Sequence, residues 1–281
     1  MINRIIYLMQ NVFKAIVIGL TFILPLACIN HPLSGNSCLV QIDSLLSLHS
    51  DSALKLLENL NPAELSEKED LAHYAILIAE AKDKKGESPT SRSLIDLAVS
   101  YYDSIGNTSM QARAHYCSGN IWYRWNNLPK ALREYYNAVY FDQKVDNVKM
   151  LSLVYGKITS VYYDSGQDKK ADSICLMTEK LALQLEDSIL WAEALSKHGM
   201  ICLRKGEGYY HEAEQKMLQA LHVSSRFKDA RLQATVSSSL STLYSYMNDG
   251  QKALAFAKHY MNCQMDTSRK YRTFLLLGDA Y

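Results

Sequence analysis

A chain of 281 residues is long enough for one or two globular domains or for one repeat array. The small numbers of Gly (12) and Pro (5), with 48% hydrophobic residues, exclude a disordered chain and favour helices. The formal net charge of +1 gives no electrostatic reason to bind DNA or RNA, so no nucleic-acid partner is expected.

The N-terminus has the anatomy of a signal peptide, which we assign to residues 1–27. Arg4 and Lys14 precede an uncharged apolar run over residues 15–27. This run is short for a membrane-spanning helix, which needs about 20 apolar residues. An uncleaved N-terminal anchor and ordinary secretion are the alternatives to a cleaved signal.

Cys28 follows Ala27, and the pair resembles the lipobox of bacterial lipoproteins, although Pro25 stands where Leu is usual. The resemblance implies cleavage before Cys28 and a lipid on its thiol, so the protein would be anchored to a membrane of the cell envelope. Residues 28–38 are expected to form a tether. Because no acidic residue directly follows Cys28, the resemblance favours a periplasm-facing anchor over a surface-exposed one.

Two short amphipathic runs, residues 40–48 and 51–60, predict a first abbreviated hairpin. Ser66 and Glu69 have the spacing of a capping box, which predicts a helix start there. A second hairpin is expected over about residues 66–105.

Residues 112–142 carry the clearest helix-hairpin pattern in the chain. Small residues at helical spacing let two antiparallel helices approach, and large aromatic residues fill the space between them. These residues are Gly119, Trp122, Ala131, Tyr135 and Ala138. The pattern resembles the tetratricopeptide repeat (TPR), although His115 stands where Trp is usual and Ser118 where Leu is usual.

The pattern recurs along the chain with a period longer than the usual 34 residues of the family. Ala131, Ala171, Ala213 and Ala253 are 40, 42 and 40 residues apart. The breakers between hairpins, Gly106, Asp146, Asp187 and Asp229, are 40, 41 and 42 apart. We therefore predict an all-α fold over residues 39–281, a right-handed α-solenoid of stacked antiparallel helix hairpins.

The last residues, 271–281, contain the best match in the chain to the aromatic, Leu-Gly, Tyr signature: Phe274, Leu277, Gly278 and Tyr281. A solenoid normally finishes on a polar capping helix. The sequence is therefore expected to be a fragment of a longer protein.

Motifs that carry chemistry are missing from the sequence. His211 and Glu212 lack the second His of a zinc protease, because Gln215 stands in its place, and there is no phosphate-binding loop or nucleophile elbow. The six cysteines show no C-x-x-C spacing, and Cys175 and Cys202 are expected in the core. We expect no catalytic residues, no cofactor and no metal site, and hence no enzyme.

In the TPR family the first helices of successive hairpins line a concave groove that binds peptides. The resemblance places ten candidate groove residues there: Arg113, Tyr116, Asn120, Tyr123, Arg124, Lys157, Tyr163, Lys197, Arg204 and Tyr246. Tyr and Arg are common anchors of interfaces, and the excess of cations would suit an acidic peptide. The alternative is an ordinary solvated helix face. Trp122, Trp125 and Trp191 are expected in the core.

Together these features predict a membrane-anchored TPR scaffold that binds a protein or peptide in the bacterial cell envelope. The alternative is the extracytoplasmic sensor half of a truncated bacterial regulator, in which repeats precede a membrane helix and an output domain.

Overall fold

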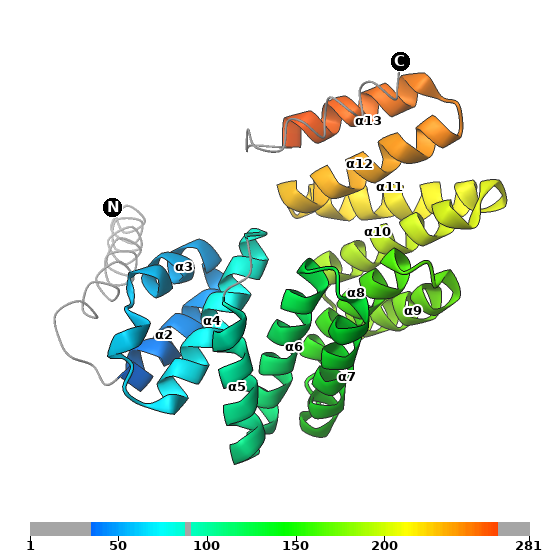
Figure 1. Ribbon diagram of the computed structural model, residues 1–281. Helices are drawn as coiled ribbons and strands as arrows, with labels where there is room; N and C mark the ends of the chain where they lie inside the picture. Colours follow the sequence, from blue (N-terminus) through cyan, green and yellow to red (C-terminus); the bar gives the residue numbers. More distant parts are fainter. Residues whose placement is uncertain (1–34, 88–90, 264–281) are drawn as a thin grey trace, which may run out of the picture. The chain divides into compact units, whose positions relative to one another are not determined.

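A computed structural model describes residues 35–87 and 91–263 (Figure 1). The predicted signal peptide over residues 1–27, the lipidation site Cys28 and the signature over residues 271–281 lie outside the described residues. The described residues form helices and short 3-10 turns, and they group into two compact units that divide between Ser104 and Ile105.

The first unit contains four helices within its described residues. They are α2 (Gly35–Leu48), α3 (Ser50–Asn59), α4 (Lys68–Lys85) and α5 (Arg92–Ile105). Its core packs apolar side chains of the first three helices against one another, among them Leu39, Ile42, Leu54, Leu57 and Leu77.

Two boundaries in this unit differ from the prediction. Helix α2 begins at Gly35, inside the segment predicted as a tether, because Leu39, Ile42 and Leu46 bury one face of a longer helix. Helix α4 begins at Lys68 after Glu67, and no side chain caps its first turn, so the capping box predicted at Ser66 does not form.

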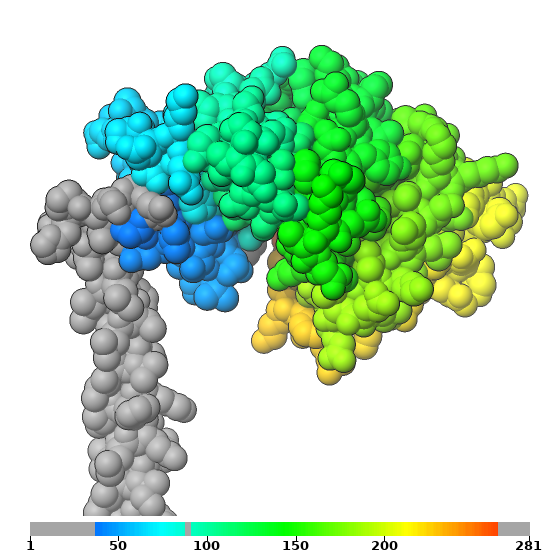
Figure 2. Space-filling model, turned by 90° about the horizontal axis from the view of Figure 1, so that it is seen from below, coloured from blue at the N-terminus to red at the C-terminus, as the bar shows by residue number. Residues whose placement is uncertain are grey.

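The described part of the second unit consists of helix hairpins. They pair α6 (Thr108–Arg124) with α7 (Leu128–Val145), α8 (Val148–Asp164) with α9 (Asp168–Gln184), α10 (Ser188–Lys205) with α11 (Tyr210–Arg226), and α12 (Ala230–Tyr246) with α13 (Gly250–Cys263). Figure 2 shows successive hairpins of this unit as adjacent bands that pass from green to yellow. Helix α10 contacts both α8 and α12, the first helices of the neighbouring hairpins.

Side-chain caps set the period of the hairpins. Asn107, Asn147, Asp187 and Asp229 each precede a first helix, and each accepts a hydrogen bond from the backbone N–H three residues later. Such a cap satisfies one of the free N–H groups of the first helical turn. Asp146 ends α7 in the left-handed conformation, with φ of 52°. The predicted breakers therefore coincide with helix boundaries.

Close approach within a hairpin depends on residues without bulk. Ala131, whose counterparts recur in each later hairpin, is fully buried. A Cβ atom on Gly119 would lie 2.5 Å from the ring of Tyr135, and one on Gly199 would lie 2.7 Å from Cγ of Met217. The predicted packing of small against large residues is confirmed. Among the described helices, none has both the length and the apolar character that crossing a bilayer requires.

Candidate functional site

The ten predicted groove residues all lie on the first helices α6, α8, α10 and α12, but they differ in exposure. Tyr116 and Asn120 are buried, and Asn120 accepts a 2.8 Å hydrogen bond from the hydroxyl of Tyr135. Lys157 lies over the ring of Tyr116, with Nζ 5.8 Å from the centroid. Tyr116 and Asn120 therefore belong to the packing between helices, and they offer little surface to a ligand.

The remaining residues reach the surface. Arg124, Arg204 and Tyr246 are exposed. The half-buried ones are Arg113, Tyr123, Lys157, Tyr163 and Lys197.

Contacts between the first helices of adjacent hairpins involve several of these residues. The hydroxyl of Tyr123 donates a hydrogen bond to Asp164, 41 residues further on. The guanidinium of Arg204 stacks on the ring of Tyr163, also 41 residues away, with Cζ 3.5 Å from the centroid. Lys197 Nζ donates a 2.7 Å hydrogen bond to the carbonyl of Gly156, again 41 residues away. The structure thus brings the candidate residues together as a ladder along the repeat.

Part of the charge on this face is balanced within the chain. Arg204 forms an ion pair with Asp168, and Arg231 forms one with Glu193 at 2.8 Å. Burial lowers the pKa of Lys197. Neighbouring carboxylates therefore offset part of the excess of cations that the sequence suggests.

The hydroxyls of Tyr123 and Tyr163 stay protonated. Burial, followed by the hydrogen bond to Asp164, raises the pKa of Tyr123, and burial raises that of Tyr163. Both side chains therefore offer a neutral ring with a polar tip.

We call Tyr123, Tyr163, Arg204 and Tyr246 the aromatic ladder. Tyr246 is its most open member, since 62% of its surface is exposed, and its ring centroid lies 6.4 Å from that of Tyr210. The ladder combines flat ring faces with a guanidinium, a combination common in protein-binding surfaces.

The prediction for tryptophan is wrong at Trp125 and confirmed at Trp122. Trp125 is 51% exposed because it follows the last residue of α6, beyond the seam between the helices. Trp122 is buried and meets Trp125 edge-on at 5.7 Å between ring centroids. Trp191 is half-buried at the margin of a core cluster.

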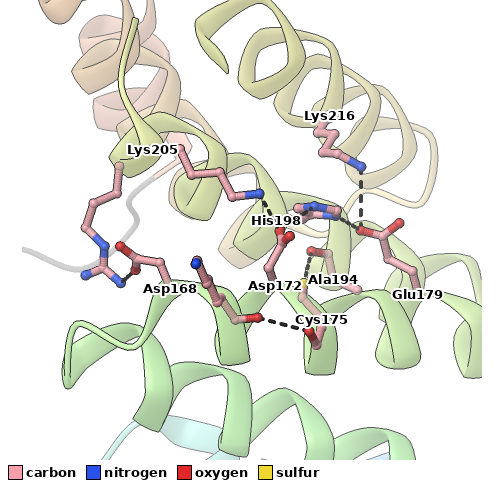
Figure 3. Close-up of polar contacts among 11 residues, drawn as sticks. Asp168, Asp172, Cys175, Glu179, Ala194, His198, Lys205 and Lys216 are labelled. Carbon is pink, nitrogen blue, oxygen red and sulfur yellow. Dashed lines mark hydrogen bonds and ion pairs between the residues drawn. The ribbon is translucent and has the colours of Figure 1, made fainter. Parts of the chain in front are cut away.

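Sequence reasoning missed a second feature, a partly buried group of ionisable side chains around His198. Figure 3 shows this imidazole between Asp172 and Glu179, both on α9. His198 Nδ1 lies 2.5 Å from Glu179 Oε1, and Nε2 lies 3.1 Å from Asp172 Oδ1. Lys205 approaches Asp172 to 2.8 Å, and Lys216 on α11 approaches Glu179 to 3.8 Å. We call these five residues the His198 cluster.

Two cysteines lie beside the His198 cluster. The Cys175 thiol lies 3.4 Å from the carbonyl of Ala194, and burial raises its pKa to about 12. Burial raises the pKa of Cys202 to about 11. Cys175 and Cys202 are buried free thiols, as predicted. The only sequence signal for the cluster was the four-residue spacing from Cys175 to Glu179 and from His198 to Cys202.

The sequence matches no protein-family model and no curated protein. Several solved structures share its fold. BtubC (BKLC) from P. vanneervenii aligns with a TM-score of 0.57 at 12% identity, over 79% of this chain and 90% of that one. The apo form of RapI aligns with a TM-score of 0.57 at 14% identity, over 88% of this chain and 70% of that one.

A third structure is a Signal Transduction ATPase with Numerous Domains from Pyrococcus horikoshii, which has a tetratricopeptide repeat sensor. It aligns with a TM-score of 0.60 at 12% identity, over 90% of this chain and 40% of that one. At identities this low, the likeness to these structures shows the fold and nothing about function. TPR repeats are generally non-catalytic scaffolds for binding other proteins. The chain is a TPR-like helical repeat protein, an all-α solenoid of stacked helix pairs.

Proposed function

We propose that the protein is a non-enzymatic scaffold that binds an extended peptide, or a segment of a partner protein, across the first helices of its second unit. The aromatic ladder is the single observation that carries this proposal. Its members lie within the last two residues of α6, α8, α10 and α12, so they recur at the same end of successive first helices. A ligand that lies across the hairpins would meet one ring or guanidinium after another.

The chemistry of the ladder favours contacts that bury flat apolar groups. Tyr246 is available for stacking, because 62% of its surface is exposed. Arg204 is already paired with Asp168 and stacked on Tyr163, so its guanidinium is pre-oriented. An acidic group on the ligand would compete with Asp168 for Arg204. We therefore assign a preference for acidic peptides a secondary role beside ring stacking.

Membrane anchoring completes the proposal. A lipid on Cys28, implied by the resemblance of the N-terminus to a lipobox, would hold the repeats at a bacterial envelope membrane, facing the periplasm. Globomycin treatment, or Cys28→Ser, should then cause the unprocessed precursor to accumulate. Unchanged processing in both cases would contradict the lipid anchor and leave the peptide-binding proposal untouched.

The binding proposal is tested with a phage-displayed peptide library selected on the full chain, immobilised in detergent. The affinity of an enriched peptide is then measured by fluorescence anisotropy. Because truncation of an interface anchor typically costs more than about 1 kcal/mol, Tyr246→Ser should weaken binding by about tenfold.

Tyr140→Ser is the matched control, because Tyr140 is 56% exposed and lies on α7, a second helix. We expect this variant to bind like the wild type. Equal affinities for the wild type, Tyr246→Ser and Arg204→Ala would show that the ladder does not contact the peptide.

A further inference from the structure

Three potential metal ligands converge beside the His198 cluster. One ligand atom each of Cys175, Glu179 and His198 lies within 4.8 Å of the other two. Zinc bonds of about 2.0–2.3 Å in tetrahedral geometry place ligand atoms about 3.3–3.8 Å apart. A contraction of no more than about 1–1.5 Å would therefore bring the three atoms to the spacing of a zinc site.

Helix geometry explains why these side chains meet. Cys175 and Glu179 are four residues apart on α9, so they share one face of the helix. His198 points at that face from α10, and Figure 3 shows the imidazole between the carboxylates, with Cys175 below it. Cys175 and His198 are 1% and 4% exposed, which shields the position from water. A bound ion would link the hairpin of α8 and α9 to that of α10 and α11.

The surroundings of the three ligands also supply negative charge. Each ring nitrogen of His198 faces a carboxylate oxygen, at 2.5 Å to Glu179 and 3.1 Å to Asp172. These two carboxylates, which Lys216 and Lys205 approach from the other side, would offset part of the cost of placing a dication in this partly buried position.

We propose that Cys175, Glu179 and His198 form a binding site for a thiophilic divalent cation of the Zn²⁺ class. A thiolate and an imidazole select zinc over Mg²⁺ and Ca²⁺, which take oxygen ligands. On binding, the Cys175 thiol releases its proton to the solvent, and its Sγ and the unprotonated nitrogen of a neutral His198 bond to the metal. A second group, His198 with Cys202 and Glu212, shares the imidazole, so the two groups compete for one ion.

The full chain, purified in detergent with a thiol-free reductant and a chelator, is titrated with Zn²⁺ by calorimetry and with Co²⁺ by absorption. We expect one ion per chain and a thiolate-to-cobalt charge-transfer band. Cys175→Ala and His198→Gln should each abolish the band and the saturable zinc heat. Cys117→Ala is the matched control, because Cys117 is also 1% exposed but lies outside the cluster. It should bind like the wild type.

Several results would overturn the proposal. They are the absence of saturable binding, a cobalt spectrum without the thiolate band, and binding retained in both Cys175→Ala and His198→Gln. Loss in Cys202→Ala with retention in Cys175→Ala would move the site to the second group and reject Cys175 and Glu179 as ligands. Circular dichroism of each variant identifies loss of fold. If Cys175→Ala unfolds, Cys175→Ser is used, since it keeps the size but is a poor zinc ligand.

Discussion

Asp142 on α7 is fully buried, and within the described residues neither of its carboxylate oxygens has a hydrogen-bond partner. Burial raises the pKa of this carboxyl to about 7, from an ordinary value of 3.8. In the pH range between these values the folded protein holds a proton that the unfolded chain has released. Stability must therefore fall as the pH rises through this range.

The size of the effect follows from the two pKa values. Between the ordinary and the raised pKa, the free energy of unfolding decreases by up to about 1.4 kcal/mol per pH unit, and the loss levels off above pH 7. This amounts to about 2.5 kcal/mol between pH 5 and pH 8. Asp142→Asn keeps the shape of the side chain and removes the titration. Between pH 5 and pH 8, the free energy of unfolding of Asp142→Asn should therefore rise by about 2.5 kcal/mol relative to that of the wild type.

Urea unfolding, followed by circular dichroism at pH 5, 6, 7 and 8, measures the difference. Asp146→Asn is the matched control, because it removes a carboxylate from an exposed left-handed position four residues later, which Asn tolerates. The pH dependence due to Asp142 should survive in this control. If the free-energy difference between Asp142→Asn and wild type does not change with pH, the carboxyl of Asp142 is not held protonated by burial.

Three further predictions concern packing, caps and buried charge. Gly119→Ala should destabilise the protein by about 1–3 kcal/mol through overpacking against Tyr135, as measured by urea unfolding; an unchanged midpoint would contradict the close approach. Asp187→Ala removes a helix cap and should cost about 1 kcal/mol in the same assay, whereas Asp187→Asn should restore most of it. His115→Ala removes the 2.7 Å partner of Glu134 Oε2, while Arg133 still pairs with Oε1 at 2.8 Å, so the variant should cost about 1–3 kcal/mol at pH 7. Glu134→Gln in the same background should recover part of this loss, and no recovery would refute the charge argument.

The hairpins between residues 112 and 262 were predictable, because two sets of markers recur together. Small residues mark the seam of each hairpin, and Gly106 with three later Asp residues marks the breaks between hairpins. Both effects are local, since packing at Gly119 and capping at Asp187 act within one hairpin. The capping box wrongly predicted at Ser66 shows the limit of a local motif. Ser66 and Glu69 have the required spacing, but α4 begins at Lys68 without a side-chain cap.

The site was less predictable, because it depends on how helices align with one another, both within a hairpin and between neighbouring hairpins. The sequence places Asn120 on a helix face but does not show that the Tyr135 hydroxyl donates a hydrogen bond to the Asn120 amide oxygen. The cations looked unpaired because Asp168 is 36 residues from Arg204. The contact between Glu179 and His198 likewise requires the alignment of α9 with α10. The four-residue spacing within each helix does not reveal that alignment.

The hydrogen bond from Lys197 to Gly156 bears on how such repeats can diverge. Its acceptor is a backbone carbonyl, which every amino acid carries, so mutation cannot remove it. A Cβ at position 156 would lie at an ordinary contact distance of 3.4 Å from the Lys197 ammonium nitrogen, so the position accepts a small side chain. Over evolutionary time one side of this junction can vary freely among small residues, and the other side alone must keep its lysine. A hydrogen bond from a side chain to a backbone carbonyl therefore requires only one position to keep its amino acid, whereas a contact between two side chains requires two.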